Sequence, residues 1–348
     1  MDLHSALASR TLELVNIPSV SGDEQAAMRY VRDAVPLEPA WASDDVLFFG
    51  LPGEPLVLLA GHVDTVPAQD NLPGRLGDGF VAGLGASDMK GGVAVMIELA
   101  RALANTHDGL GAGFLFFVRE ELPAEVSPLP DFFAAYDGPH PELAIVLEPT
   151  DNEIHAGCLG NLVAEVVVHG TSVHSARPWT GKNAIHEAIR ALAPVADLEP
   201  LDVELDGLLF REVLSVVGIE GGIADNVVPD RAAARLNYRY APNRTAAEAE
   251  ARLRALVPGV EMEVLSNNRG APVVVDRPLV RRLREAGGFD VQPKQAWTPV
   301  AQFAEAGIDA VNLGPGATAY AHRRDERVET GELVVTFEAL RRFLAGSV

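Results

Sequence analysis

Cysteine is almost absent from this sequence, because its 348 residues include only Cys158. One thiol cannot form an intramolecular disulfide or a thiolate zinc cluster, and it suits a reducing compartment. Long apolar runs are missing too, since none approaches the ~18 residues that a membrane helix needs. The first residues lack the basic stretch and apolar block of a signal peptide. We therefore expect a cytoplasmic protein with no membrane partner.

Positive charge is also scarce. The chain has 28 Lys and Arg against 49 Asp and Glu, for a formal net charge of −21 at pH 7. A nucleic-acid-binding protein needs a basic face, so this balance argues against a nucleic-acid partner. The charge offers no general attraction to an anionic small molecule, and an anionic substrate would have to be bound by local arginines.

The apolar residues, 48 % of the chain, form an alternation of strands and helices over roughly the first 158 residues. Three runs without a polar face are typical of parallel strands covered by helices: 56–62, 111–118 and 143–147. Residues 88–104 have helical periodicity, and Ser21 followed by Glu24 predicts a capped helix start. The alternation predicts an α/β fold.

The pattern changes between residues 159 and 270. The stretches 161–175 and 230–243 alternate polar and apolar residues, which predicts strands with one exposed face. Two helices are expected at 182–195 and 245–257, the first with Ile185, Ala188, Ile189 and Leu192 at helical spacing. After residue 270 the first style resumes. We therefore predict a discontinuous catalytic domain, 1–158 and 271–348, with a smaller α+β domain, 159–270, inserted in it.

Residue types that bind metals follow several of the predicted buried strands where each strand ends. They are His62 and Asp64, Glu120 and Glu121, Glu148 and His322, while Asp88 lies between a glycine-rich turn and a helix. The carboxyl ends of strands in a doubly wound sheet line one crevice, so these residues can converge. Imidazole and carboxylate ligands without thiolates suit a catalytic zinc or related divalent site. Asp64 shares a strand face with His62 and could orient its ring.

Each residue also has an ordinary structural interpretation. Asp88 stands where a helix N-cap would, and Glu148 precedes a proline in what could be a surface turn. A lone His62 is more often a satisfied polar residue than a ligand. Their coincidence at strand ends favours the metal site. For His174, at a strand end beside Arg177, structure and function are equally good interpretations.

Competing catalytic motifs do not fit. The sequence has no GxSxG elbow and no Walker-type loop, and His186 in "HEAIR" lacks the second histidine of a zincin helix. "GPGATA" from Gly314 matches GxGxxA after a strand, but no convincing helix follows it. Dinucleotide binding is therefore disfavoured.

Five ordered motifs carry a resemblance to a known family: "GHVDTVP", "GASDMKGG", "REE", "LEPT" and "AHRRDE". In this order they resemble the two-zinc aminoacylase and carboxypeptidase superfamily of metallopeptidases. Further stretches, among them "AGCLGN", "VHSARPWTGKNAIH", "NVVPD" and "NYRYAPN", are similar to its succinyl-diaminopimelate desuccinylases of actinobacterial type. The resemblance covers nearly the whole chain. It implies a zinc-exopeptidase-like domain with a mostly parallel sheet between helices, and an inserted dimerisation or lid domain.

The resemblance implies a ligand set for two Zn²⁺ ions, although Co²⁺ and Mn²⁺ accept the same residue types. Asp88 would bridge the two ions. His62 and Glu148 would complete one site, and Glu121 and His322 would complete the other. The peptide bond after Asp88 is cis in relatives and would be cis here.

The resemblance also implies the catalytic roles. Glu120 would be the general base, taking a proton from the attacking water and returning it to the departing amine. Asp64 would orient His62. His174 would stabilise the oxyanion in the active site of a partner subunit, because the inserted domain dimerises in the family. The reaction would convert N-succinyl-LL-2,6-diaminopimelate to succinate and LL-diaminopimelate, a precursor of lysine.

Four residues are candidates for binding the substrate. Arg177 and Arg239 are proposed for its carboxylates, because a planar guanidinium can bind a carboxylate through two hydrogen bonds. Arg239 lies on the polar face of its predicted strand, and a solvated face explains either arginine equally well. Asn226 and Thr298 match substrate-contact positions of the family.

The stretch "WTPVAQF" departs from the family, which usually has an Asp at Pro299 and an Arg at Gln302. These changes leave the metal ligands intact but leave the acyl group open. An acetylornithine-type deacylase or a metallo-dipeptidase is therefore an alternative to the desuccinylase. A non-catalytic metal-binding protein is disfavoured because Glu120 is retained.

Overall fold

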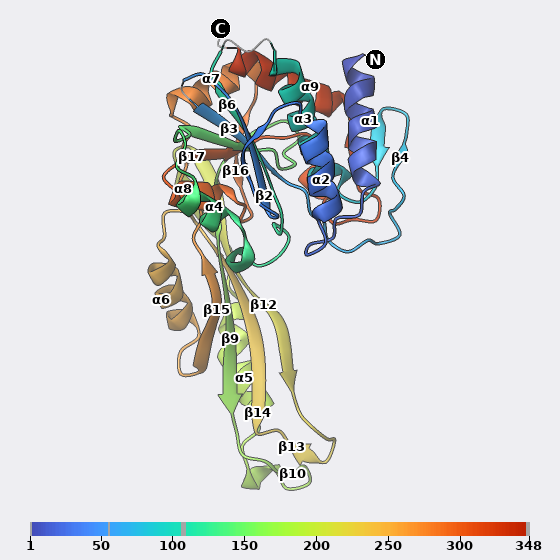
Figure 1. Ribbon diagram of the computed structural model, residues 1–348. Helices are drawn as coiled ribbons and strands as arrows, with labels where there is room; N and C mark the ends of the chain where they lie inside the picture. The colour runs from blue at the N-terminus through green and yellow to red at the C-terminus, as the bar shows by residue number, and fades with distance from the viewer. Residues whose placement is uncertain (1, 55, 106–108, 346–348) are drawn as a thin grey trace. The chain divides into compact units, whose positions relative to one another are not determined.

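The computed structural model describes residues 2–54, 56–105 and 109–345, and its contacts divide the chain into two compact units. The first unit comprises Met1–Ala156, Val274–Gln292 and Pro299–Val348, and the second comprises Gly157–Val273 and Pro293–Thr298. The predicted functions of the two parts, catalysis and dimerisation, stay predictions at this point. We describe each unit by itself (Figure 1).

The first unit is built on an eight-stranded sheet in the order β1-β2-β6-β3-β7-β17-β8-β16. Its strands are, in that order, Pro39–Ala42, Val46–Leu51, Gly111–Phe117, Leu56–His62, Leu143–Val146, Asp309–Asn312, Ile154–Cys158 and Val291–Lys294. The central strands β6, β3, β7 and β17 are parallel, whereas β1, β2 and β8 pair antiparallel at the flanks. The predicted α/β class with a mostly parallel sheet is confirmed.

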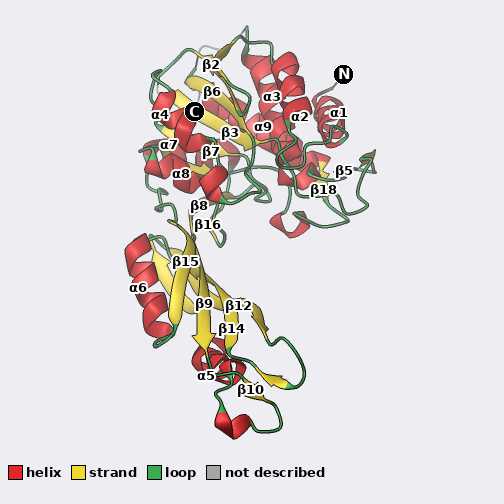
Figure 2. Ribbon diagram, turned by 60° about the horizontal axis from the view of Figure 1, so that its bottom comes forward, coloured by secondary structure: helices red, strands yellow, loops and turns green. Residues whose placement is uncertain are grey.

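Helices cover both faces of this sheet, which is why its central strands carry no polar face (Figure 2). On one face α1 (Leu3–Val15), α3 (Gly91–Leu103) and α9 (Thr330–Leu344) pack on one another. On the other, α4 (Leu129–Ala135) contacts α8 (Val300–Glu305) through Phe133 and Phe303. The remaining helices of this unit are α2 (Gln25–Ala34) and α7 (Pro278–Gly287).

Helix α3 forms as predicted, with Val93, Met96, Ile97 and Ala100 all buried. It begins directly after a kinked turn, η1 (Ala86–Lys90), in which Asp88 and Met89 have non-helical backbone angles. A side chain at Gly92 would lie 2.5 Å from the carbonyl oxygen of Leu147, so only glycine lets the helix start approach the end of β7. This close approach brings Asp88 near the strand end that precedes Glu148.

The predicted cap of α2 is wrong. Helix α2 begins at Gln25, Glu24 occupies the N-cap position, and no side chain caps the helix. Ser21 instead donates its hydroxyl proton to Asp64 at 2.7 Å, and Glu24 accepts from the backbone N–H of Gly22. The Ser21 hydroxyl, which the local sequence predicts as the cap of α2, is therefore bound by Asp64, a residue from a distant part of the chain.

The second unit is a five-stranded antiparallel sheet, in the order β11-β12-β14-β9-β15, with two helices. Its strands are, in that order, Leu201–Leu205, Leu208–Gly221, Arg231–Tyr240, Gly160–His169 and Glu261–Asn268. Helices α5 (Ala184–Ala196) and α6 (Ala246–Leu256) supply residues to its core with Leu162, Leu236 and Tyr238. Ile189 does not join that core as its helical spacing indicates, since it is 56 % exposed.

Strand β12 extends beyond its neighbour β11. The ladder with β11 ends at Glu212, and no described strand pairs with Val213–Gly221 on the side away from β14. Val217 and Ile219 in this free part are each 58 % exposed. A long apolar strand with an unpaired edge is a surface that favours pairing with another chain.

Smaller elements complete the two units. In the first unit β4 (Arg75–Leu76), β5 (Phe80–Ala82) and β18 (Arg327–Glu329) form a three-stranded sheet. In the second, β10 (Val173–His174) pairs with β13 (Val227–Val228). Short 3-10 turns lie at Ala124–Val126, Pro178–Thr180 and Thr318–Tyr320. None of the described helices is long and apolar enough to cross a membrane.

Candidate metal centre

His62 is the last residue of β3, and its ring has different partners at its two nitrogen atoms. Its Nδ1 lies 3.3 Å from a carboxylate oxygen of Asp64. Its Nε2 lies 3.4 Å from Asp88 Oδ1 and 3.8 Å from Glu148 Oε1. Both His62 and Asp64 are fully buried. The strand end therefore fixes one nitrogen to Asp64 and directs the other towards two carboxylates, as the alternation of the strand predicts.

Asp88 lies between two histidines that are 260 residues apart in sequence. Its Oδ1 faces Nε2 of His62, and its Oδ2 lies 3.5 Å from Nε2 of His322. Glu121 lies 2.9 Å from the same nitrogen of His322. The side chain of Asp88 is not a helix cap, because no side-chain cap is formed at the start of α3. The peptide bond between Asp88 and Met89 is cis, as the resemblance implies.

Glu120 and Glu121 lie on the loop after β6, and Asp64 holds that loop. The two backbone N–H groups each donate to a different oxygen of the Asp64 carboxylate, both at 3.1 Å. Arg119, just before them, has a left-handed backbone with φ of 62° and pairs with Asp45 on the turn between β1 and β2. The two acids are thus parts of a fixed turn and not a solvated pair.

The residues around Asp88 have the composition of a cation site. Two groups offer ligand atoms within 4.8 Å of one another, His62–Asp88–Glu121 and His62–Glu120–Glu148. These donors are imidazoles and carboxylates, which suit a catalytic divalent cation. Glu120 belongs to the second group, so its carboxylate lies within reach of a cation bound there. Its role as the base stays a prediction.

The protonation of these groups reflects crowded charge. Burial raises the pKa of Glu120 well above its usual range, and the neighbouring charge of Glu148 adds to this effect. Burial opposes a charge on His62, but hydrogen bonds with Asp64 and Asp88 outweigh it and raise the pKa of His62. Hydrogen bonds to Asp88 and Glu121 raise the pKa of His322 to about 10. Protons and metal ions compete for the same imidazole and carboxylate atoms. A divalent cation could therefore replace the protons that these crowded groups hold, and the residue types fit such a cation.

Sequence reasoning missed two residues next to this centre. Glu326, inside the motif "AHRRDE", is 2 % exposed and accepts hydrogen bonds from the turn that carries Asp88. Lys90 is also buried and donates to the carbonyl oxygen of Ile17 at 2.9 Å. The sequence does not show that these two charged residues are buried. A glutamate that follows two arginines and an aspartate is typical of an exposed surface segment.

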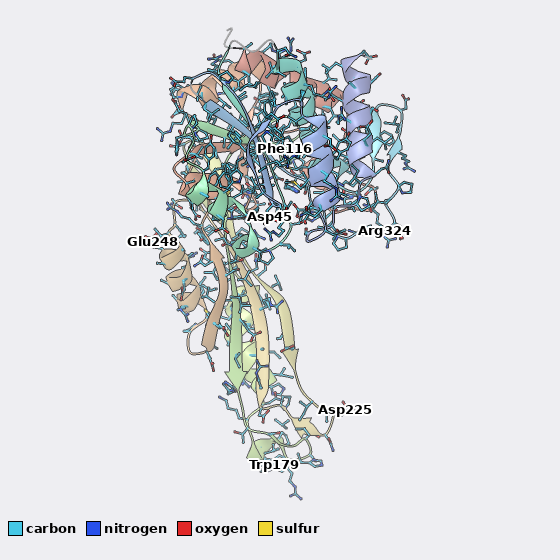
Figure 3. The ribbon with its side chains drawn as sticks, viewed as in Figure 1. Asp45, Phe116, Trp179, Asp225, Glu248 and Arg324 are labelled. Carbon is cyan, nitrogen blue, oxygen red and sulfur yellow. The ribbon has the colours of Figure 1, made fainter. Side chains whose placement is uncertain are left out.

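Three of the predicted residues outside the centre lie together in the second unit. His174 is in β10, and the backbone N–H of Arg177 donates to its carbonyl oxygen at 2.9 Å. Asn226 lies beside them, because its carbonyl oxygen accepts from Ser175. The Nδ1 of His174 accepts from the backbone N–H of Ala176, and its side chain is exposed. These residues form one exposed corner past the end of β9 (Trp179 and Asp225 mark it in Figure 3).

Arg239 and Thr298 lie at the other end of the same sheet. Arg239 pairs in register with Asn161 at the start of β9, and its guanidinium donates to Asn237 at 3.0 Å. The carbonyl oxygen of Thr298 accepts from the thiol of Cys158. Asn161 and His169, which mark the two ends of β9, are eight residues apart, or about 26 Å at ~3.3 Å per residue. One chain therefore does not bring His174 and Arg239 together.

The two family departures have local structural roles in the first unit. Pro299 is the N-cap residue of α8. Gln302 is 7 % exposed, accepts from the hydroxyl of Ser127 at 3.0 Å and donates to the carbonyl oxygen of Ala124 at 3.4 Å. Its amide is thus used to hold the loop after Glu121, and it supplies no positive charge.

The fold and the centre define a metallopeptidase class, and the chain belongs to peptidase family M20/M25/M40, whose model matches residues 58–346. Within that family it is 35 % identical to the succinyl-diaminopimelate desuccinylase of Corynebacterium glutamicum over an alignment of 361 positions, which covers 96 % of this chain and 95 % of that protein. It is 41 % identical over 300 residues to a Mycobacterium tuberculosis protein named as a candidate succinyl-diaminopimelate desuccinylase, DapE, with 83 % and 82 % covered.

Solved structures show the same fold at low identity. The aminopeptidase PepT of Bacillus cereus aligns with a TM-score of 0.78 and 20 % identity over 99 % of this chain and 98 % of its own. The YXEP protein of Bacillus subtilis, described as a dinuclear metal-binding peptidase of family M20, aligns with a TM-score of 0.72 and 16 % identity over 98 % and 97 %. These likenesses concern the fold of both units.

Proposed function

We propose that this chain is a two-metal amide hydrolase that cleaves N-succinyl-LL-2,6-diaminopimelate into succinate and LL-diaminopimelate, a step towards lysine. The observation that carries the proposal is Asp88 between His62 and His322, each of which also faces a second carboxylate. The names of the two relatives at 35 % and 41 % identity supply the substrate. The proposed compartment is the cytoplasm. The chain's single cysteine, Cys158, is a buried free thiol, which suits reducing conditions.

In this proposal Asp88 is shared by two cations, Zn²⁺ or alternatively Co²⁺ or Mn²⁺. His62 and Glu148 complete one site, and Glu121 and His322 complete the other. When bound, the cations supply Lewis acidity to the attacking water and to the scissile carbonyl. The pairing distances of 2.9–3.8 Å along the series Glu148–His62–Asp88–His322–Glu121 support this division into two sites.

The chain's own residues carry the proton transfers. Glu120 takes a proton from the attacking water and delivers it to the departing amine. Glu120 lies partly buried beside Glu148 and His62, which places its carboxylate at the proposed centre where the water would be activated. Asp64 keeps both the ring of His62 and the loop of Glu120 in place. The site would therefore change little during the reaction, which is a condition for efficient catalysis.

We further propose that a homodimer completes the site. His174, with Arg177 and Asn226, lies at the opposite end of β9 from Arg239 and Thr298. A second copy, paired through the free edge of β12, could supply His174 for the oxyanion while Arg239 binds a substrate carboxylate. The hydroxyl of Thr298 is buried and has no hydrogen-bond partner among the described residues, which suits a substrate contact.

The test is hydrolysis of matched substrates by the metal-loaded protein. We expect release of succinate from N-succinyl-LL-diaminopimelate with a kcat/KM at least tenfold above that for N-acetylornithine and for a simple dipeptide. Metal content measured on the same sample should approach two ions per chain. A tenfold preference for the acetyl substrate would overturn the succinyl assignment while leaving the hydrolase in place.

The acetylornithine-type deacylase remains the second candidate because of Gln302. Where the family has an arginine, this chain has a neutral amide whose hydrogen bonds are made to Ser127 and Ala124. One cationic group for a succinyl carboxylate is therefore missing from this position.

A further inference from the structure

A buried carboxylate outside the proposed ligand set, Glu326, holds the turn that carries Asp88. Its Oε1 accepts from the backbone N–H groups of Ser87 and Asp88, both at 3.0 Å. Its Oε2 accepts from the N–H of Gly85 at 2.9 Å, and its carbonyl oxygen accepts from the N–H of Gly83 at 3.0 Å. Four backbone donors of one short segment therefore converge on a single residue.

The arrangement is that of an anion bound in a concavity of backbone N–H groups. Gly85 has a left-handed φ of 77°, and a side chain there would lie 2.7 Å from Thr65. A turn with one left-handed residue directs successive N–H groups to one side and forms an anion site. Here the anion is the protein's own carboxylate. Burial of a carboxylate is costly, and it raises the pKa of Glu326 to about 7; the three N–H donors offset part of this cost.

The location of Glu326 follows from a small antiparallel ladder. Strand β18 pairs with β5 so that Arg327 faces Ala82, and the residues just beyond this pair are Glu326 and Gly83. Glu326 also lies four residues after His322. The carbonyl oxygen of His322 accepts from Gln69 at 3.0 Å, which fixes the intervening segment. One segment therefore supplies one proposed ligand and fixes the backbone of another.

We propose that Glu326 is a positioning residue that sets the direction of the Asp88 carboxylate, so that its two oxygens face two cations. The inference rests on the proposed two-metal function. Glu326 does not contact the reacting atoms. It acts through the backbone N–H of Asp88, much as Asp64 acts through those of Glu120 and Glu121. The two loops of the centre are thus each held by a buried carboxylate.

Changing Glu326 to Gln would replace one acceptor oxygen by an NH₂ group. Either the N–H of Gly85 or those of Ser87 and Asp88 would then face another donor. The turn would shift, and the carboxylate of Asp88 would lose its fixed direction. Residues that orient metal ligands typically contribute 10–100-fold to metal affinity. We expect a loss of about 10–100-fold in the affinity of at least one cation for E326Q.

The test is a titration of metal-free protein with Co²⁺, followed by calorimetry and by the visible absorption spectrum. The variants are E326Q, the conservative E326D and the control D325N. Asp325 adjoins Glu326 but is exposed and pairs with Arg323 at 2.8 Å, so D325N removes the same charge without touching the turn. Melting temperatures of the metal-free variants are measured alongside.

We expect wild type and D325N to bind two Co²⁺ with the same affinities and spectra. E326Q should bind at least one ion 10–100-fold more weakly with an altered spectrum, and E326D should fall between the two. If E326Q melts at a lower temperature but binds both ions as wild type does, Glu326 is only structural and the inference is wrong. If E326Q does not fold, unchanged Co²⁺ binding by E326D overturns the inference.

The activity assay separates this inference from the proposed function. If wild type binds two Co²⁺ but does not hydrolyse the succinyl substrate, the proposed function fails, while the titration of E326Q still decides the role of Glu326. If wild type hydrolyses the substrate and E326Q binds Co²⁺ normally, the function stands and this inference falls.

Discussion

At the scale of single residues, Asp64 does more than its sequence position indicates. Strand alternation predicts that it faces His62, and the structure places the two 3.3 Å apart. The same carboxylate also accepts from Ser21 and from the backbone of Glu120 and Glu121. Because one side chain fixes a proposed ligand and the loop of the proposed base, its removal should affect both functions.

Replacing Asp64 by Asn should therefore weaken metal binding. Every neighbour of this carboxylate is a hydrogen-bond donor, so an NH₂ group would leave one donor without an acceptor. We expect metal affinity to fall about 10–100-fold and kcat/KM to fall at least as far. Metal-buffered dialysis and initial rates would measure the two effects. Ser21→Ala, which removes one donor and leaves the carboxylate, is the matched control and should stay within a few-fold of wild type.

Replacing Glu120 by Gln tests the proposed base directly. The amide has nearly the shape of the acid but cannot carry the proton, so kcat should fall about 100- to 10,000-fold. Metal content should stay near two ions per chain if Glu120 is a base and not a ligand. Glu125→Gln, on the exposed turn that follows, should leave both unchanged. Loss of one ion in E120Q would instead assign Glu120 to the ligands, which its distance to His62 and Glu148 allows.

Much of the centre is predictable from sequence because parallel strands end at one edge. His62 ends and Glu148 closely follows an apolar run of the kind typical of buried parallel strands, and a sheet brings the carboxyl ends of such strands together. Asp88 is harder, since its turn imitates a helix start. Glu326 and the true partner of Ser21 are outside the reach of local pattern, because each is fixed by a contact between segments far apart in the chain.

At the scale of elements, helical spacing in the sequence predicts where a helix forms, but it predicts less well which residues of that helix are buried. Helix α3 buries all four residues expected on its inner side, since it lies under the sheet of the first unit. Helix α5 forms where expected, but it leaves Ile189 exposed. A two-layer unit covers only one side of such a helix, and the sequence period cannot tell how wide the covered side is.

Helix α6 offers a clean test of local stability in the second unit. Thr245 and Glu248 form a reciprocal capping box at its start, and both side chains are accessible to solvent. Thr245→Ala should lower the free energy of unfolding by about 1 kcal/mol, because the N–H of Glu248 loses its acceptor. Urea unfolding would measure this difference. Glu250→Gln, on the same helix but outside the cap, should change stability by less than about 0.5 kcal/mol. Equal losses for the two variants would show that the cap contributes nothing.

At the scale of the whole molecule, the distribution of the predicted substrate residues argues for two copies. His174 lies past one end of the five-stranded sheet and Arg239 lies at its other end, and the β14–β9 ladder runs without a break between these ends. Bringing the two residues together within one copy would require breaking this ladder. The free edge of β12 and the exposed Ile189 supply an apolar surface on which a second copy could pair.

The double variant V217K/I219K should therefore be monomeric. Two lysines on the free edge of β12 place like charges opposite each other across a symmetric interface, and they oppose strand pairing. Sedimentation velocity should show a dimer for wild type and a monomer for the variant, with kcat reduced about 100-fold or more if His174 of the second copy stabilises the oxyanion. L265K on β15, the other edge strand, is the control and should remain dimeric and active. A V217K/I219K monomer with wild-type kcat would place His174 outside the reaction, while a dimer that persists would move the interface away from β12.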